Sequence, residues 1–217
     1  MAFIFEQIRT GGDRNFAYLI GDGSTLEAVV IDPSYDPEAV VERAKDQRLK
    51  VSTIINTHGH GDHTNGNDMA QELTGADIAA YKNSSVPHEM DLDEGKVLNV
   101  GNLSLKIFHT PGHCEDHIVV YVQRHHVAIT GDHLFVGKIG GTATEEQAEL
   151  QYYHLQRLFS ELPSETTIWP GHDVGVRPSS TLALEKESNP FLMVKNFEEF
   201  LDLKNNWADF KKKKGLK

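Results

Sequence analysis

Residues 56–67 read NTHGHGDHTNGN and crowd four potential metal-binding side chains into six positions, at His58, His60, Asp62 and His63. The stretch follows VSTIIN (51–56), whose run of β-branched and apolar residues predicts a short buried strand. A loop that leaves such a strand is held firmly at its base, and its two glycines are expected to turn the backbone tightly and to leave space beside an ion. Imidazole nitrogens and carboxylate oxygens suit Zn²⁺, Fe²⁺ or Mn²⁺. The stretch therefore predicts a metal-binding loop at a strand end.

Three more residues of the same chemistry follow predicted strands elsewhere in the chain. His113 lies in TPGHCEDH, Asp132 in TGDHLF and His172 in WPGHDV. Four separate strand ends therefore offer potential ligands in the same local setting. Because a rigid scaffold fixes side chains on loops of this kind, we expect all seven residues to meet in one site.

The seven side chains can be divided into two coordination spheres. One contains three nitrogens, from His58, His60 and His113. The other contains Asp62, His63 and His172. Asp132 has two carboxylate oxygens and can bridge the spheres. Each ion would keep an open position, as catalytic sites do. Two ions about 3.5–4 Å apart would share a hydroxide and polarise a carbonyl under attack.

Predicted strands and helices alternate along both halves of the chain. In the first half, strands at 16–20 and 27–32 flank a hairpin turn, and helices are expected at about 37–47 and 65–73. In the second half, the expected strands are 103–109, 117–122, 126–132 and 166–170, and the expected helices are about 144–159, 180–188 and 194–212. This order suggests two mixed sheets packed together with helices outside, and a doubly wound parallel sheet would give similar local patterns.

The composition narrows the class of protein. With 217 residues, 39% hydrophobic and 24% charged, the chain is an ordinary globular one. We take residues 1–217 as a single domain with a C-terminal helical segment at about 179–212. Cys114 is the only cysteine, so no intrachain disulfide can form, and a cytoplasmic location is expected. The start of the chain has none of the features of a signal peptide.

The net charge of −11 argues against nucleic acid as a partner, and no apolar run reaches membrane-spanning length. The only basic run, Lys211–Lys214, is expected to be a solvated helix end, and a clamp for an anionic substrate is the alternative. The expected partner is a small molecule. The oligomeric state does not follow from the sequence.

The motifs together resemble those of the metallo-β-lactamase superfamily. The resemblance covers Asp32 in VVIDP, the H-x-H-x-D-H loop, TPGH, TGD and the last PGH, and so most of the chain. Within the superfamily it is similar to the glyoxalase II-like branch, which contains hydroxyacylglutathione hydrolases and persulfide dioxygenases. The stretch TLALEKESNPFL (181–192) also resembles this branch.

This resemblance implies an α+β fold, a four-layer αββα sandwich with the metal site along one edge of the two sheets. It implies that the ligands are His58, His60, Asp62, His63, His113, Asp132 and His172. Asp32 resembles the family's acidic residue that supports the histidine loop without binding the metal itself.

One stretch departs from the pattern of the glutathione-using enzymes. They usually carry GCGR or GCGK after the TGD strand, and the basic residue helps to hold glutathione. Here the stretch reads VGKIGGTATEEQ (136–147), with the basic residue displaced to Lys138. Thioester chemistry is unaffected by this departure, but the thiol carrier is left open.

The leading hypothesis is a binuclear metallohydrolase, with zinc as the first choice of metal and iron or manganese as alternatives. A metal-bridging hydroxide would cleave a thioester of the acylglutathione type, with Asp62 handling the proton and Asp132 bridging the ions. A lactonase or other small-ester hydrolase would need the same ligands.

The resemblance also implies a second hypothesis, a mononuclear iron persulfide dioxygenase that holds Fe²⁺ through His58, His113 and Asp132. A non-catalytic metal-binding module would be expected to lack some ligands, and none is missing. Three further roles stay open. His117 is either a support for the metal site or a strand-end histidine, and Cys114 either lies near the site or fills space. Lys138 is either an exposed lysine or a contact for a carboxylate.

Overall fold

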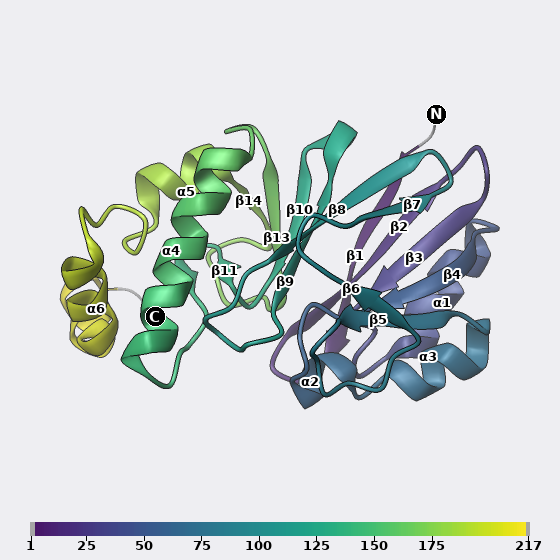
Figure 1. The fold of residues 1–217 in the computed structure, drawn as a ribbon, viewed down its shortest axis with the longest axis horizontal. Coiled ribbons are helices and arrows are strands. Elements are labelled where there is room, and N and C mark those ends of the chain that lie inside the picture. The colour runs from purple at the N-terminus through teal and green to yellow at the C-terminus, as the bar shows by residue number, and fades with distance from the viewer. Residues whose placement is uncertain (1–2, 216–217) are drawn as a thin grey trace.

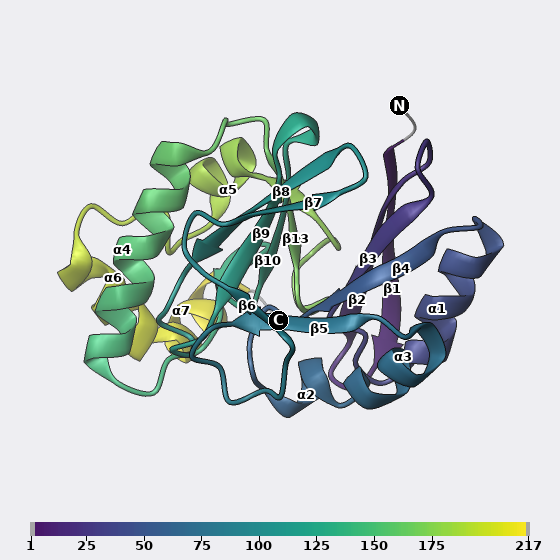
Figure 2. The same ribbon diagram turned by 45° about the vertical axis from the view of Figure 1, so that its right-hand side comes forward.

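The computed structural model describes residues 3–215 and contains two six-stranded mixed sheets that pack face to face (Figure 1). The first sheet has the order β1-β2-β3-β4-β5-β6, and the second has the order β14-β13-β10-β9-β8-β7. Helices α1 and α3 cover the outer face of the first sheet, while α4 and α5 lie outside the second (Figures 1 and 2). The four-layer αββα sandwich expected from the resemblance is therefore confirmed.

The first sheet is built by the N-terminal half of the chain. Its strands are β1 (Phe3–Gly11), β2 (Asn15–Asp22), β3 (Glu27–Ile31), β4 (Lys50–Ile55), β5 (Asp77–Tyr81) and β6 (Met90–Leu92). The strands β1 to β3 pair antiparallel, whereas β3 to β6 pair parallel. The helices of this half are α1 (Pro37–Asp46), α2 (Gly61–Thr64) and α3 (Asn67–Thr74).

The second sheet follows in the C-terminal half. Its strands are β7 (Val97–Val100), β8 (Leu103–His109), β9 (Ile118–Val122), β10 (Val127–Gly131), β13 (Thr167–Pro170) and β14 (Ser180–Thr181). A short hairpin of β11 (Leu134–Phe135) and β12 (Lys138–Ile139) leaves β10. The remaining helices are η1 (Gln123–His125), α4 (Glu145–Glu161), α5 (Leu182–Ser188), α6 (Phe197–Asn205) and α7 (Trp207–Lys214).

Apolar side chains fill each interface between layers. The central core lies between the two sheets and contains Ile20, Ile55, Ile107 and Ile129, all fully buried. A second core joins the first sheet to α1 and α3, and a third joins the second sheet to α4 and the C-terminal helices. Burial of this apolar surface is the main favourable contribution to folding, and it fixes the strand ends that carry the site.

Most of the elements expected from the sequence are present, with differences at their ends. Antiparallel pairs within both sheets exclude the doubly wound parallel alternative. The expected helix at 180–188 begins at Leu182, because Ser180 and Thr181 pair with β13 as a strand. The expected tail helix begins at Phe197 and is interrupted at Asn206. The strands β1, β5, β6 and β7 and the β11–β12 hairpin were not predicted from the sequence.

Among residues 3–215, no helix combines the length and the apolar character that a membrane crossing requires.

Candidate metal centre

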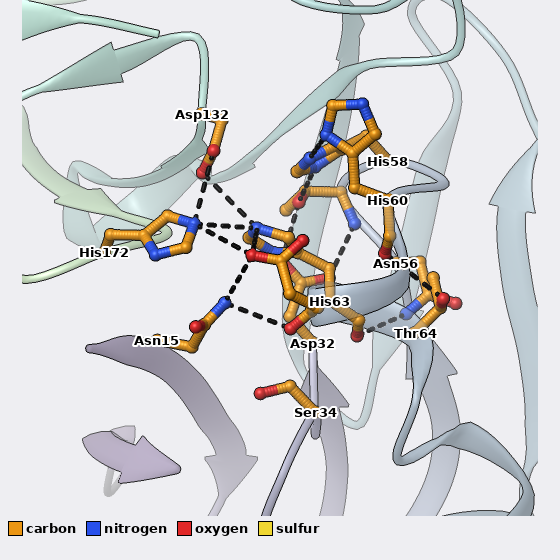
Figure 3. A network of polar contacts seen from close by, with 12 residues as sticks. Asn15, Asp32, Ser34, Asn56, His58, His60, His63, Thr64, Asp132 and His172 are labelled. Atoms are coloured by element: carbon orange, nitrogen blue, oxygen red, sulfur yellow. Dashed lines mark hydrogen bonds and ion pairs between the residues drawn. The ribbon is translucent and has the colours of Figure 1, made fainter. Parts of the chain in front are cut away.

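The histidine loop is anchored by Asp32, which follows β3. The Asp32 carboxylate accepts hydrogen bonds from the Thr57 backbone N–H at 2.8 Å and from the Thr57 hydroxyl at 2.6 Å. Its Oδ2 also lies 2.9 Å from His63 Nδ1. Asp32 is buried, so these charge-assisted hydrogen bonds form away from solvent. One carboxylate thus ties the start of the loop to its last histidine. Figure 3 shows Asp32 beside His63.

Three histidines form one cluster of nitrogen atoms. His60 Nδ1 lies 3.0 Å from His58 Nε2 and 3.1 Å from His113 Nε2. His58 and His60 come from the loop after β4, whereas His113 comes from the loop after β8. These are the three residues expected to form the all-nitrogen sphere.

A second cluster lies beside the first. His63 Nε2 lies 3.2 Å from His172 Nε2 and 3.8 Å from Asp62 Oδ2, and His172 Nε2 lies 3.4 Å from the same carboxylate oxygen. Asp132 lies between the clusters, because its carboxylate oxygens are 3.7 Å from His113 Nε2, 3.5 Å from His63 Nε2 and 3.3 Å from His172 Nε2. In Figure 3, Asp132 and His172 face the histidine loop from the opposite side. All seven predicted residues therefore meet, although their role as ligands stays a prediction.

Four of the histidines have one ring nitrogen anchored away from the centre. His113 Nδ1 donates to the Gly141 carbonyl at 2.7 Å, and His172 Nδ1 donates to the Asp13 carbonyl at 2.9 Å. His58 Nδ1 contacts the Thr57 hydroxyl, and His63 Nδ1 contacts Asp32. Anchoring of this kind fixes the tautomer and points the other nitrogen, Nε2, into the centre, as in protein metal sites.

The electrostatics of the two clusters differ. Burial and the neighbouring imidazoles hold the pKa of His58 well below its ordinary value, so this ring is neutral and able to bind a cation. Burial would also lower the pKa of His63, but the carboxylates of Asp32, Asp132 and Asp62 raise it to about 9. Positive charge is therefore favoured at His63 Nε2, where it comes from either a proton or a metal ion.

The geometry fits the coordination of a divalent metal ion. Two ligands about 2.0–2.1 Å from one tetrahedral zinc lie about 3.3–3.4 Å apart, and the contacts within the two clusters range from 3.0 to 3.8 Å. Oδ1 of Asp132 is buried and accepts no hydrogen bond from the described residues. A buried carboxylate oxygen without a partner is costly unless a cation lies beside it. The donor set and this oxygen both favour a metal centre.

The glycine that precedes His172 has a steric role. A Cβ at Gly171 would lie 2.3 Å from Asp132 Oδ1 and 2.8 Å from His63 Cε1, so no side chain fits there.

The two glycines of the histidine loop, Gly59 and Gly61, were expected to turn the backbone tightly and to leave space beside an ion, and this expectation was less accurate. Neither Gly59 nor Gly61 has a positive φ, and a Cβ at Gly61 would meet nothing within 4 Å. Only a Cβ at Gly59 would meet a neighbour, Oδ2 of Asp116 at 2.8 Å.

Asn15 is a site residue that the sequence analysis missed. Its side-chain amide donates to Oδ2 of Asp62 at 3.1 Å and to the Asp62 carbonyl at 3.0 Å, and its backbone pairs with His172. Asn15 is the first residue of β2, next to a turn, and it is fully buried. A polar residue beside a turn is usually exposed, so the sequence pattern does not reveal this burial. The amide and the nearby imidazoles lower the pKa of Asp62 against the opposing effect of burial.

His117 contacts the backbone of Asp132, which favours its role as a support for the metal site. Its Nε2 accepts a hydrogen bond from the Asp132 backbone N–H at 3.1 Å, and its Nδ1 lies 2.8 Å from the Thr110 hydroxyl. Cys114 lies near His58 and His113, within 4.8 Å of their nitrogens. Burial and Asp116 raise the pKa of the Cys114 thiol, which is consistent with the space-filling role.

Comparisons with known proteins agree with this architecture. The family model described as the metallo-beta-lactamase superfamily matches residues 10–187. The chain is 33% identical over 162 residues to hydroxyacylglutathione hydrolase of Maricaulis maris, which covers 73% of this chain and 62% of that protein. It is 29% identical over 195 residues to the mitochondrial persulfide dioxygenase ETHE1 of Homo sapiens, covering 88% of this chain and 76% of that protein.

The solved structure of ETHE1 from Myxococcus xanthus superposes on the fold with a TM-score of 0.86 at 31% identity, covering 94% of this chain and 91% of that one. The family match spans most of the chain and includes all seven clustered residues as well as Asn15 and Asp32. The chain therefore belongs to the metallo-β-lactamase superfamily.

Proposed function

We propose that the protein is a metal-dependent hydrolase that cleaves a thioester, with two divalent ions, most simply zinc, in the centre. The observation that carries the proposal is the pair of clusters joined by Asp132. One ion would be held by His58, His60 and His113. The other would be held by Asp62, His63 and His172.

Divalent ions in this centre would lower the pKa of a water molecule and polarise the thioester carbonyl. The side chains supply the rest of the chemistry. Asp62 is ionised, about one-third exposed and held by Asn15, so it is placed to accept a proton from the attacking water. In the overall reaction, water adds to the acyl carbon and the acyl–sulfur bond breaks, which yields a carboxylic acid and a thiol.

The hydroxyacylglutathione hydrolases among the relatives support a thioester substrate of the acylglutathione type. The chain spans about 62% of the length of the Maricaulis maris relative, so the substrate is a proposal for this chain. We propose a cytoplasmic location on the basis of the single cysteine. A lactone or another small ester is a variant that would use the same residues.

A persulfide dioxygenase is the second candidate, and the likeness to the human persulfide dioxygenase ETHE1 and to the Myxococcus xanthus ETHE1 structure favours it. A single Fe²⁺ would then be held by His58, His113 and Asp132, whose facing atoms include the pair His113 Nε2 and Asp132 Oδ2 at 3.7 Å. The two candidates differ in the number and kind of ions and in the consumption of oxygen.

The deciding experiment measures metal content by mass spectrometry on protein purified without oxygen or added metal. Zinc-loaded and iron-loaded samples are then assayed for thiol release from acylglutathione and for oxygen uptake with glutathione persulfide. Close to two ions per chain and thiol release support the hydrolase. One iron per chain and oxygen uptake would replace it with the dioxygenase.

Asp132→Ala provides the matching variant. It should lose both bound metal and thiol release, because Asp132 contacts both clusters. Asp93→Ala, which removes an exposed carboxylate paired with Lys82, is the control and should keep both properties. Full thiol release by Asp132→Ala would refute the proposed centre.

A further inference from the structure

A groove of about 680 Å³ opens beside the candidate metal centre. It lies between the β11–β12 hairpin, the loop after His172 and the helices α5 and α7. Four cationic side chains line it, from four separate segments of the chain: Arg14, Lys138, Arg177 and Lys211. The convergence of these segments is a tertiary feature of the fold.

The groove is close to the centre. The ring of Phe135 lies 5.9 Å from the ring of His172, and Lys138 Nζ lies 5.3 Å from the centroid of Phe135. Arg14 is adjacent as well, because the carbonyl of Asp13 accepts the hydrogen bond from His172 Nδ1. A substrate whose reacting group lies at the centre can therefore extend into the groove.

The positive charge of the groove is not neutralised by its own lining. Among residues 3–215, Lys138, Arg177 and Lys211 form no ion pair, and Arg14 has only a loose, exposed contact of 3.7 Å with Asp13. Burial lowers the pKa of Lys138, and Lys211 and Arg14 lower it further, against the smaller opposing effects of Asp13 and Asp132. Lys138, Lys211 and Arg14 therefore lie within electrostatic reach of one another.

The one carboxylate in the lining is already engaged. Glu185 is fully buried and accepts hydrogen bonds from the Gly137 N–H at 2.8 Å and from the Asn189 amide at 2.9 Å. It therefore holds the hairpin against α5 through Oε2, and the lining has four cations to this one carboxylate. In a chain of net charge −11, such a local concentration of cations points to a polyanionic ligand.

The lining favours a ligand with a high density of negative charge. Two of the four cations are guanidinium groups, which bind phosphate or carboxylate in a bidentate manner, and a terminal phosphate carries up to about two negative charges where a carboxylate carries one. The ring of Trp207 and the side chains of Val136 and Pro190 add apolar surface along the same groove. A flexible thiol arm that ends in phosphate matches both the apolar surface and the cationic side chains of the groove. The glutathione tripeptide matches them less well, because its two carboxylates are offset by an ammonium group.

We infer that the groove binds the phosphate end of a phosphorylated, pantetheine-type thiol, and that the preferred substrates are thioesters of such a carrier. The inference rests on the proposed thioester hydrolysis and specifies its substrate class. Water adds to the acyl carbon, the acyl–sulfur bond breaks, and the products are a carboxylic acid and the phosphorylated thiol.

The test compares kcat/KM of the metal-loaded enzyme for one acyl group on three thiols: coenzyme A, pantetheine without phosphate, and glutathione. The coenzyme A thioester should be preferred over the pantetheine thioester by at least ~10-fold, since pantetheine lacks the phosphate and so forms no charge-assisted hydrogen bond to the groove. A fourth substrate, the same acyl group on a carrier protein's phosphopantetheine, distinguishes a protein-borne arm from free coenzyme A.

Charge variants connect this preference to the groove. Lys138→Gln and Lys211→Gln should each lower kcat/KM for the coenzyme A thioester by about 10-fold and leave the pantetheine thioester unchanged. Lys186→Gln is the matched control, because Lys186 is an exposed lysine of α5 outside the groove lining. Equal kcat/KM for the coenzyme A and pantetheine thioesters, or full activity in both groove variants, would overturn the inference.

A binding experiment separates the inference from the proposed function. Desulfo-coenzyme A is titrated into the metal-loaded protein, and tryptophan fluorescence follows binding near Trp207. Binding that is weakened in Lys138→Gln, without hydrolysis of any thioester, would support the groove and refute thioester hydrolysis. Absence of binding together with rapid hydrolysis of acylglutathione would support thioester hydrolysis and refute the phosphate-binding groove.

Discussion

Gly171 lies so close to Asp132 that a Cβ on residue 171 would be 2.3 Å from the Asp132 Oδ1 atom. The backbone after β13 thus passes directly beneath the carboxylate that joins the two clusters. His172 follows at the next position, so one glycine allows two facing candidate ligands, Asp132 and His172, to approach the same point.

Gly171→Ala should therefore damage the centre. The added methyl group must displace Asp132 or His63, which should lower the free energy of unfolding by about 1–3 kcal/mol and lower zinc affinity at least ~10-fold. Chemical denaturation and competition with a fluorescent chelator measure the two effects. Gly61→Ala is the matched control, because a Cβ there meets nothing within 4 Å. Equal losses in the two variants would contradict the steric explanation.

Asp32→Asn tests the support of the histidine loop. The substitution keeps the shape of the side chain but removes the charge that faces His63 Nδ1 at 2.9 Å. Loss of such a partner typically lowers metal affinity 10–100-fold, and we expect an effect of about that size. The measurement is zinc affinity by chelator competition. Asp93→Asn, at an exposed position, should bind zinc like the unaltered protein, and an unchanged affinity in Asp32→Asn would refute the supporting role.

The stability of the metal-free protein should depend on pH through His63. Its folded-state pKa is raised from 6.5 to about 9 by the surrounding carboxylates, against the opposing effect of burial. A group with a raised folded-state pKa stabilises the fold fully below its unfolded pKa, and this stabilisation is lost as pH rises through the folded pKa. The melting temperature in the presence of a chelator should therefore fall between about pH 6.5 and about pH 9.

The zinc-loaded protein should behave in the opposite way. A metal ion takes the place of the proton on His63, so binding strengthens as protons are removed and weakens in acid. Differential scanning calorimetry at matched pH values, with and without zinc, tests both trends. A metal-free melting temperature that stays flat or rises over this range would show that His63 is not the responsible group.

Asn15→Ala should change the pH dependence of catalysis. The Asn15 amide donates to the Asp62 carboxylate and favours its ionised form, so removal of the amide should raise the pKa of Asp62. The acidic limb of the kcat/KM profile should then move to higher pH, with a drop of about 10-fold or more at its centre. Asn99→Ala, at an exposed strand position, is the control. A lower rate with an unmoved profile would mean that Asn15 acts only through structure.

The sequence by itself predicted which residues lie together in the candidate centre and roughly where the strands lie. Ligand-type residues that follow apolar runs are local signals, and the motifs HGHGDH, PGH and TGD place them after four strands. The same is true of α4, whose capping box of Thr144 and Gln147 is present in the structure. Such motifs can be recognised in the sequence because a strand and the loop that follows it are contiguous in the chain.

Only the tertiary structure decided how these residues face one another. The approach of His63 to His172 joins residues 109 positions apart, and Asn15 reaches Asp62 across 47 positions. His60 presents Nδ1 to the centre, whereas four other histidines present Nε2 because a neighbour anchors Nδ1 of each. Short strands such as β5 to β7 carry weak patterns, and their partners across the sheet fix them.

The cationic groove is likewise a product of the tertiary structure. Arg14, Lys138, Arg177 and Lys211 belong to four segments with no motif in common, and the packing of α7 and α5 against the hairpin brings them to one surface. A sequence records each charge but not the distance between charges, and the electrostatic energy that selects a polyanion depends on that distance.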